Sequence, residues 1–86
     1  MRQLTVLVYE YVPDVLERRG PYREEHLATL RDDPAVVMGG ALGDPPHGAL
    51  FVFETSEAAE AFVARDPYQA AGLVTAWRVE PWAVAV

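Results

Sequence analysis

Residues 3–11 read QLTVLVYEY, and this stretch decides the fold. It is rich in β-branched and aromatic residues and its side chains alternate in character, which predicts a β-strand. One face carries Leu4, Val6 and Val8, and the other carries Thr5, Leu7, Tyr9 and Tyr11. Because both faces are largely apolar, we expect this strand to be covered on both sides.

The rest of the chain supplies the other elements of a sheet with helices. Apolar runs predict strands over 35–42, 49–54 and 73–85, with Gly39-Gly40 as a bulge or a point of close approach. Caps and helical patterns predict a turn over 14–20 closed by a left-handed Gly20, helices over 21–33 and 55–65, and a turn over 67–71 closed by Gly72. The order βαββαβ predicts an α+β, ferredoxin-like fold with an antiparallel sheet and both helices on one face.

The apolar second face of the sheet requires a partner. The chain has 86 residues, enough for a single domain spanning 1–86, and 51% of them are hydrophobic. It contains no cysteine, so no disulfide can stabilise this small core. Strands 49–54 and 73–85 repeat the two-sided apolar pattern. We therefore predict a homodimer in which two sheets pack face to face.

Charge and composition exclude several classes of function. The net charge is −6, from 13 acidic residues against seven bases, all arginine, which argues against nucleic acid or an anionic membrane as a partner. No apolar run reaches the roughly 18 residues of a membrane span, and the N-terminus lacks the layout of a signal peptide, so we expect a cytoplasmic protein. There is no His-x-x-x-His pair, phosphate-binding loop or serine nucleophile elbow, and we expect neither a metal nor a cofactor. His47, in the loop GDPPHG, is interpreted as a solvated residue.

The helix predicted over 21–33 places two polar side chains, Arg23 and His26, on its apolar face. Desolvation there would keep the His26 imidazole neutral and ready to accept a proton. A packed histidine bonded to a carbonyl group is an equally good interpretation. Two such side chains together predict an anion between them, although an Arg23 that only extends to the rim fits the pattern as well.

Asp66 has two interpretations. In the run DPYQ of residues 66–69 it can cap the following helical turn, with Gln69 completing a capping box. It also lies at the C-terminus of the preceding helix, where a carboxylate could orient an imidazole or shuttle a proton. Spacing favours the cap, and it does not bring Asp66 to His26, which is forty positions away.

Several motifs, in order along the chain, resemble those of the YCII-related (YciI-like) family. They are R-x-x-H-L at 23–27, the glycine pair at 39–40, S-E-x-A at 56–59, D-P-Y-x-x-A-G-L at 66–73 and V-E-P-W at 79–82. Together they cover nearly the whole chain. One departure is Ala41, which follows Gly40 where the family often has Gly-Pro.

The resemblance implies a dimeric α+β barrel with a pocket in which the family's catalytic histidine and aspartate face each other. Carried onto this chain, the catalytic pair falls on His26 and Asp66, and the arginine of the motif falls on Arg23. We predict that Arg23, Gly40 and Tyr68 bind the substrate. The family is similar to muconolactone isomerases and includes a dehydrochlorinase-like member. This similarity implies lyase or isomerase chemistry.

Two functions are consistent with these residues. In the first, the chain is a cofactor-free enzyme in which His26 acts as general base on a compact anionic substrate, Asp66 stabilises the imidazolium and Arg23 holds the substrate carboxylate or enolate. In the second, it is a non-catalytic dimeric metabolite-binding or accessory module in which Arg23 and Asp66 form a buried ion pair. A cofactor-free oxygenase of the same barrel class is a third alternative.

Overall fold

The computed structural model describes residues 2–86, and Met1 of the predicted domain lies outside them. A four-stranded antiparallel sheet has the order β2-β3-β1-β4. Its strands are β1 (Arg2–Tyr11), β2 (Val36–Leu42), β3 (Gly48–Phe53) and β4 (Val74–Val84). The helices are α1 (Val15–Arg18), α2 (Gly20–Arg31), α3 (Ser56–Arg65) and α4 (Pro67–Ala70). The βαββαβ, ferredoxin-like architecture expected from the sequence is confirmed.

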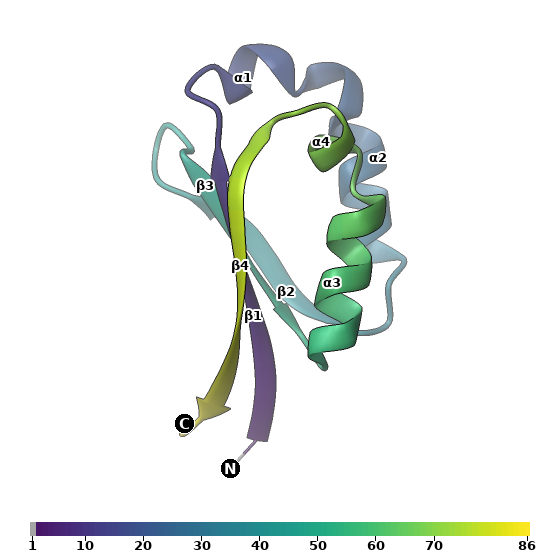
Figure 1. Cartoon of the computed structure of the whole chain (residues 1–86), viewed down its shortest axis with the longest axis vertical. Helices are drawn as coiled ribbons and strands as arrows, with labels where there is room; N and C mark the ends of the chain where they lie inside the picture. Colours follow the sequence, from purple (N-terminus) through teal and green to yellow (C-terminus); the bar gives the residue numbers. More distant parts are fainter. Residues whose placement is uncertain (1) are drawn as a thin grey trace.

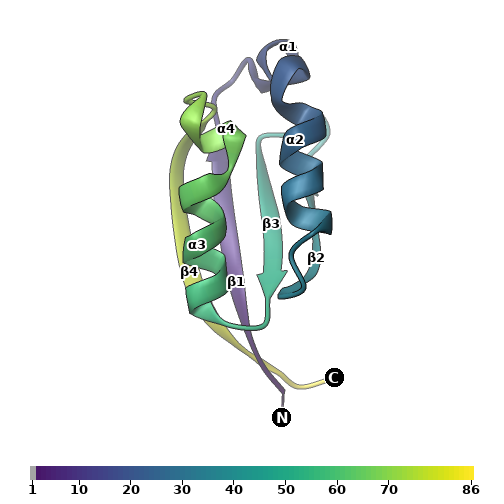
Figure 2. The ribbon, with the colours of Figure 1, turned by 90° about the vertical axis from the view of Figure 1, so that its right-hand side faces the viewer.

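The helices lie on one face of the sheet, with α2 and α3 side by side across it (Figures 1 and 2). The core between these layers joins the inner face of β1 and β3 to α3. Its buried side chains are Leu7, Tyr9, Ala49, Phe51, Phe53, Ala59, Phe62 and Val63. A second buried cluster, formed by Val15, Tyr68 and Leu73, closes the end of the molecule where α1 and α4 meet the sheet.

The opposite face of the sheet is covered by no element of residues 2–86 (Figure 1). Paired residues on this open face include Val6 with Val52, Val8 with Leu50, and Leu4 with Trp82. Leu50, Trp82 and Met38 are 37%, 44% and 64% exposed. A groove of about 310 Å³ runs over it, lined by Val6, Val8, Leu50, Arg78, Glu80, Pro81 and Trp82. The apolar second face that the strand patterns predicted is therefore present.

The prediction that Gly20 adopts a left-handed conformation is wrong. Helix α2 begins at Gly20, and Arg19 before it has helical angles (φ −74°, ψ −20°). Pro21 fits within the first turn of α2, where its missing N–H is not needed, so the chain passes from α1 into α2 without a left-handed residue. Within residues 2–86 the positive-φ residues are Gly43 and Gly72, and Gly72 closes α4 as predicted.

Of the two neighbouring glycines, Gly39 is a point of close approach, whereas a Cβ atom on Gly40 would meet nothing within 4 Å. A Cβ atom on Gly39 would lie 2.6 Å from Cδ1 of Phe51, so β2 can pass this ring only because position 39 has no side chain. The irregular register of β2 falls between Val36 and Met38, and the bulge alternative for the glycines is therefore wrong. None of the helices within residues 2–86 has the length and apolar character needed to cross a membrane.

Candidate active site

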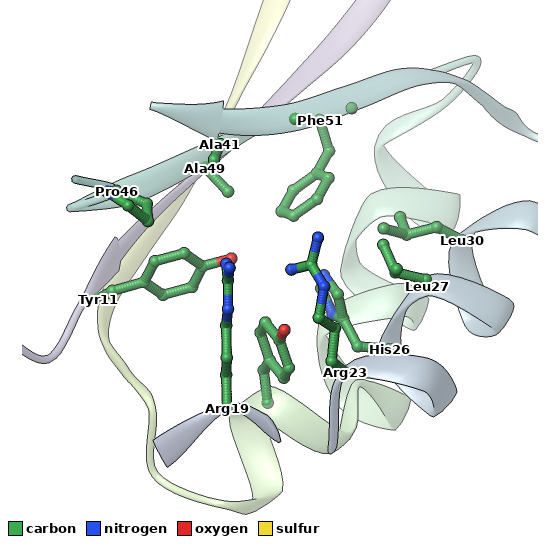
Figure 3. Close-up of a pocket in the computed structure, with 13 residues that line it drawn as sticks. Tyr11, Arg19, Arg23, His26, Leu27, Leu30, Ala41, Pro46, Ala49 and Phe51 are labelled. Atoms are coloured by element: carbon green, nitrogen blue, oxygen red, sulfur yellow. The ribbon is translucent and has the colours of Figure 1, made fainter. Parts of the chain in front are cut away.

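A cavity of about 440 Å³ lies between α2 and the β2–β3 side of the sheet (Figure 3). Four of the five site residues expected from the sequence line it: Arg23, His26, Gly40 and Tyr68. The fifth, Asp66, is buried behind His26. The remaining lining residues are Tyr11, Arg19, Leu27, Leu30, Gly39, Ala41, Pro46, Ala49 and Phe51.

His26 and Asp66 form a buried hydrogen bond. The distance from His26 Nδ1 to Asp66 Oδ1 is 2.7 Å, and the two residues are only 4% and 1% exposed. Because an ionised carboxylate only accepts hydrogen bonds, Nδ1 carries the hydrogen and Nε2 is left as the ring's acceptor. Nε2 has no hydrogen-bond partner within residues 2–86, so it is the imidazole atom left for a bound molecule.

Asp66 also caps α4, as predicted, and the same carboxylate makes the hydrogen bond to His26. Its Oδ1 accepts from the backbone N–H of Tyr68 at 3.1 Å, while Oδ2 accepts from the hydroxyl of Tyr9 at 2.8 Å. With His26, three donors converge on one carboxylate. The predicted capping box is wrong, because Oε1 of Gln69 is buried without a partner in residues 2–86.

Tyr9 is the donor that the sequence analysis missed. Burial, together with the negative charge of Asp66 and the hydrogen bond to it, raises the pKa of Tyr9 well above its ordinary value. The hydroxyl therefore stays protonated and donates to Asp66 at all ordinary pH values. The alternation of β1 correctly grouped Tyr9 with Leu7 on one face of the strand, but it carried no signal for a polar partner fifty-seven positions away.

The imidazole of His26 is held in place by aromatic rings. It stacks on Tyr68 with the ring centroids 3.8 Å apart and the planes inclined by 1°. The ring centroids of Phe51 and Phe62 each lie 6.0 Å from the centroid of the imidazole. The hydroxyl of Tyr68 is buried and has no hydrogen-bond partner within residues 2–86, although Tyr68 lines the cavity.

Two arginines extend into the cavity from the α1–α2 segment (Figure 3). Arg23 is exposed and Arg19 is half-buried. Neither forms an ion pair within residues 2–86. Asp66 is paired with His26 instead, so the buried Arg23–Asp66 pair required by the binding-module alternative is not formed.

Arg19 was missed because the predicted break at Gly20 separated it from the helix. In the structure Arg19 is the N-cap of α2 and has helical backbone angles, and Arg19, Arg23 and His26 follow one another at spacings of four and three residues. That spacing brings side chains to one helical face. This spacing was already visible in the sequence and would have identified Arg19 if the helix predicted from residue 21 had been extended by two residues.

His47 and Gly40 are the remaining residues singled out from the sequence. His47 is exposed and is not among the residues that line the cavity, in agreement with its interpretation as a loop residue, whereas its neighbour Pro46 forms part of the wall. Gly40 pairs with Leu50, whose side chain is on the open face, so Gly40 contributes backbone to the cavity. No group of three or more His, Asp or Glu side chains within residues 2–86 is arranged to hold a metal ion.

Comparisons with known proteins identify both the family and the fold. The model of the YCII-related domain matches residues 3–83. The 5-chloro-2-hydroxyhydroquinone dehydrochlorinase TftG from Burkholderia phenoliruptrix, solved with 2,5-dihydroxybenzoquinone, is 26% identical over 95% of each chain, with a TM-score of 0.76. SnoaB, a cofactor-independent oxygenase from Streptomyces nogalater, is 15% identical over 100% of this chain and 96% of its own, with a TM-score of 0.65.

The two neighbours carry different weight. The likeness to SnoaB shows a shared fold alone, and it adds nothing specific to the oxygenase alternative. Both neighbours belong to the dimeric α+β barrel group, the fold class expected from the motifs. No match was found among curated proteins.

Proposed function

The chain belongs to the family of YCII-related domains, and on that premise we propose that it is a cofactor-free enzyme, a lyase or isomerase with dehydrochlorinase-like chemistry. The observation that carries this proposal is the buried His26–Asp66 hydrogen bond in the wall of a cavity. A neutral imidazole that is oriented by a carboxylate and keeps one nitrogen free can act as a general base. The substrate is a compact anion.

The proposed reaction begins with proton transfer to His26. Nε2 removes a proton either from a C–H beside a carbonyl group, whose electron pair moves onto the carbonyl oxygen as an enolate, or from an acidic O–H, whose electron pair stays on that oxygen as an enolate or phenolate. Arg23 balances the enolate charge, and Asp66 stabilises the imidazolium. In one outcome the enolate re-forms its carbonyl and expels a leaving group such as chloride from the carbon β to it, and His26 passes its proton to water, so that HCl is lost. In the other outcome His26 returns the proton to the carbon skeleton at another position. The first outcome is elimination and the second is isomerisation.

The ligand bound to the dehydrochlorinase TftG supports the proposal of a ring-shaped substrate for the present chain. Its bound ligand, 2,5-dihydroxybenzoquinone, is a planar ring with acidic hydroxyl groups. The cavity of the present chain has aromatic walls at Tyr11, Phe51 and Tyr68 and cationic groups at Arg19 and Arg23. Such a combination suits a small, planar, anionic ring.

We further propose that the enzyme is a homodimer assembled through the open sheet face. Exposed contiguous apolar surface on a soluble chain marks an interaction site. The open face carries Leu50, Met38 and Trp82 as large exposed side chains, and two copies can bury this surface against each other. In this dimer the second copy covers the open sheet face, which the helices of the first copy do not cover.

The test is turnover of 5-chloro-2-hydroxyhydroquinone, followed as chloride release. We expect His26→Gln to lower kcat by about 10²–10⁴-fold, the usual contribution of a general base, and Asp66→Asn to lower it in the same direction. His47→Gln is the matched control, because it alters an exposed histidine outside the cavity, and it should keep the wild-type rate.

Unchanged turnover in both His26→Gln and Asp66→Asn would overturn the catalytic assignment. Binding of the ring without chloride release by the wild-type chain would instead favour the non-catalytic metabolite-binding module. Circular dichroism of each variant separates a loss of chemistry from a loss of fold.

A further inference from the structure

The cavity contains positive charge that the protein itself does not balance. Within residues 2–86 five of the seven arginines are paired with carboxylates: Arg2 with Glu54, Arg18 with Asp14, Arg31 with Glu24, Arg65 with Asp33 and Arg78 with Glu80. The other two, Arg19 and Arg23, both line the cavity and have no such partner. The chain has 13 acidic residues and a net charge of −6, so the positive charge at the cavity is opposite in sign to the charge of the chain as a whole.

The two charges act on the same end of the cavity. Arg19 and Arg23 are four residues apart along one helical path, a spacing that places side chains next to each other. The pKa of Tyr11 shows that both charges reach it. Burial raises this pKa, and so do the neighbouring Tyr68 and Asp66, whereas the positive charges of Arg19 and Arg23 both lower it. Like charges at this spacing repel each other, and a bound anion would relieve the repulsion.

A third donor belongs to the same wall. The hydroxyl of Tyr68 is buried without a partner in residues 2–86, although the residue lines the cavity and is only 2% exposed. A buried hydroxyl without a partner is costly unless a ligand satisfies it. Its ring is fixed by the stack on His26, which limits where the hydroxyl can point.

We propose that Arg19, Arg23 and the Tyr68 hydroxyl form a subsite for two anionic oxygens, so the preferred ligand is a small planar dianion. The inference rests on the proposed function, because it concerns the same cavity. It goes further in specifying the charge of the substrate and in naming a second arginine that binds it. Arg19 and the Tyr68 hydroxyl hold one anionic oxygen, and Arg23, at the more exposed position, holds the other.

The experiment compares two rings that differ in one acidic group. 2,5-Dihydroxybenzoquinone has two acidic hydroxyls and is a dianion in neutral solution, whereas 2-hydroxybenzoquinone has one. The chain has neither cysteine nor lysine, so neither thiols nor lysine amines compete by reacting with the quinones. Calorimetric titration of the full chain at pH 7 should show at least tenfold tighter binding of the dianion. The net charge of −6 would by itself favour the opposite order.

Variants assign this preference to residues. Arg19→Gln should weaken binding of the dianion by about 10–100-fold and change binding of the monoanion by less than threefold, because it removes a charge-assisted contact that the monoanion does not need. Tyr68→Phe keeps the stack on His26 and should weaken dianion binding by about 3–10-fold. Arg31→Gln removes the same charge from an arginine of α2 that does not line the cavity, and binding should stay within twofold of wild type.

Equal affinity of the wild-type chain for the two rings would overturn this inference, as would an Arg19→Gln loss no larger than that of Arg31→Gln. The outcome is separate from that of the catalytic proposal. His26→Gln should retain the preference for the dianion, because the imidazole is not one of the three donors. If chloride release fails the catalytic test while this preference persists, the dianion subsite stands without the enzyme.

Discussion

Asp66 combines two tasks that are usually given to different residues. Its carboxylate ends one helix, caps the next through the Tyr68 N–H and holds His26 in a single orientation. The cap fixes the backbone around Asp66, and the buried hydroxyl of Tyr9 fixes the side chain. The imidazole is therefore positioned by a group that is itself constrained on both oxygens, which is the arrangement that precise general-base chemistry needs.

At the residue scale, Tyr9→Phe tests the support of Asp66. We expect the free energy of unfolding at pH 7 to fall by about 1.5–3 kcal/mol, because a buried carboxylate loses one of its three donors while the ring volume is retained. Urea denaturation measures the change. Tyr22→Phe removes an exposed hydroxyl of α2 and should stay within about 0.5 kcal/mol of wild type.

The same variant has a distinct pH dependence. The pKa values of Tyr9 and Tyr11 are raised in the folded chain, so the folded state holds these protons more firmly than the unfolded state. The two protonated hydroxyls therefore contribute to the free energy of unfolding. This contribution is complete below pH 10 and is lost as the pH rises above 10, at up to about 1.4 kcal/mol per pH unit for each tyrosine. Tyr9→Phe should show a shallower alkaline decline, and an unchanged slope would contradict this account.

At the element scale, the passage from α1 into α2 determines which side chains enter the cavity. Since Arg19 and Gly20 are both helical, Arg19 joins the face that carries Arg23 and His26. A left-handed residue at position 20 would have reoriented this segment relative to the helix. The reversal of handedness occurs instead at Gly72, where α4 must turn into β4.

Two alanine substitutions test these assignments. Gly20→Ala should stay within about 0.5 kcal/mol of wild type, because position 20 is helical and an added Cβ meets nothing beyond its chain neighbours within 4 Å, while Pro21 disfavours a helical residue with a Cβ before it and offsets the gain in helix propensity. Gly72→Ala should destabilise it by about 1–2 kcal/mol, because φ is +74° there. Thermal unfolding measures both variants. A loss for Gly20→Ala as large as that for Gly72→Ala would restore the left-handed assignment of Gly20.

The prediction from sequence succeeded where a pattern is local. Alternation along β1 correctly placed Tyr9 and Val6 on opposite faces of the sheet, because in a strand the side is decided by parity alone. The break assumed at Gly20 failed because Gly followed by Pro is compatible both with a left-handed stop and with a helix start. Neighbouring residues did not distinguish these two conformations.

At the scale of the whole molecule, the sheet separates two surfaces with different roles. The helix-covered face contains the core and the cavity, and the open face presents apolar side chains from all four strands. Because the cavity lies on the helix side, assembly through the open face leaves it unobstructed by the partner's sheet. The proposed dimer is thus compatible with the proposed site.

Leu50→Asp tests the dimer. It places a charge at the centre of the open face, and the expected result is a monomer of 9.5 kDa where the wild-type chain has twice that mass, measured by light scattering after gel filtration. Leu16→Asp makes the same change at an exposed leucine of α1 and should leave the dimer intact. A monomeric wild-type chain, or a dimeric Leu50→Asp variant, would exclude this interface.

The sequence by itself determined the order of elements, the two apolar faces of the sheet and the motif positions of His26, Asp66 and Arg23. These features depend on periodicity, caps and short motifs, which act over a few neighbouring residues. Only the tertiary structure decided that Asp66 meets both His26 and Tyr9 and that Arg19 joins Arg23 in one cavity. Such meetings depend on how α2 and the α3–α4 corner pack against the sheet, and packing of segments forty or more residues apart is not encoded in any local pattern.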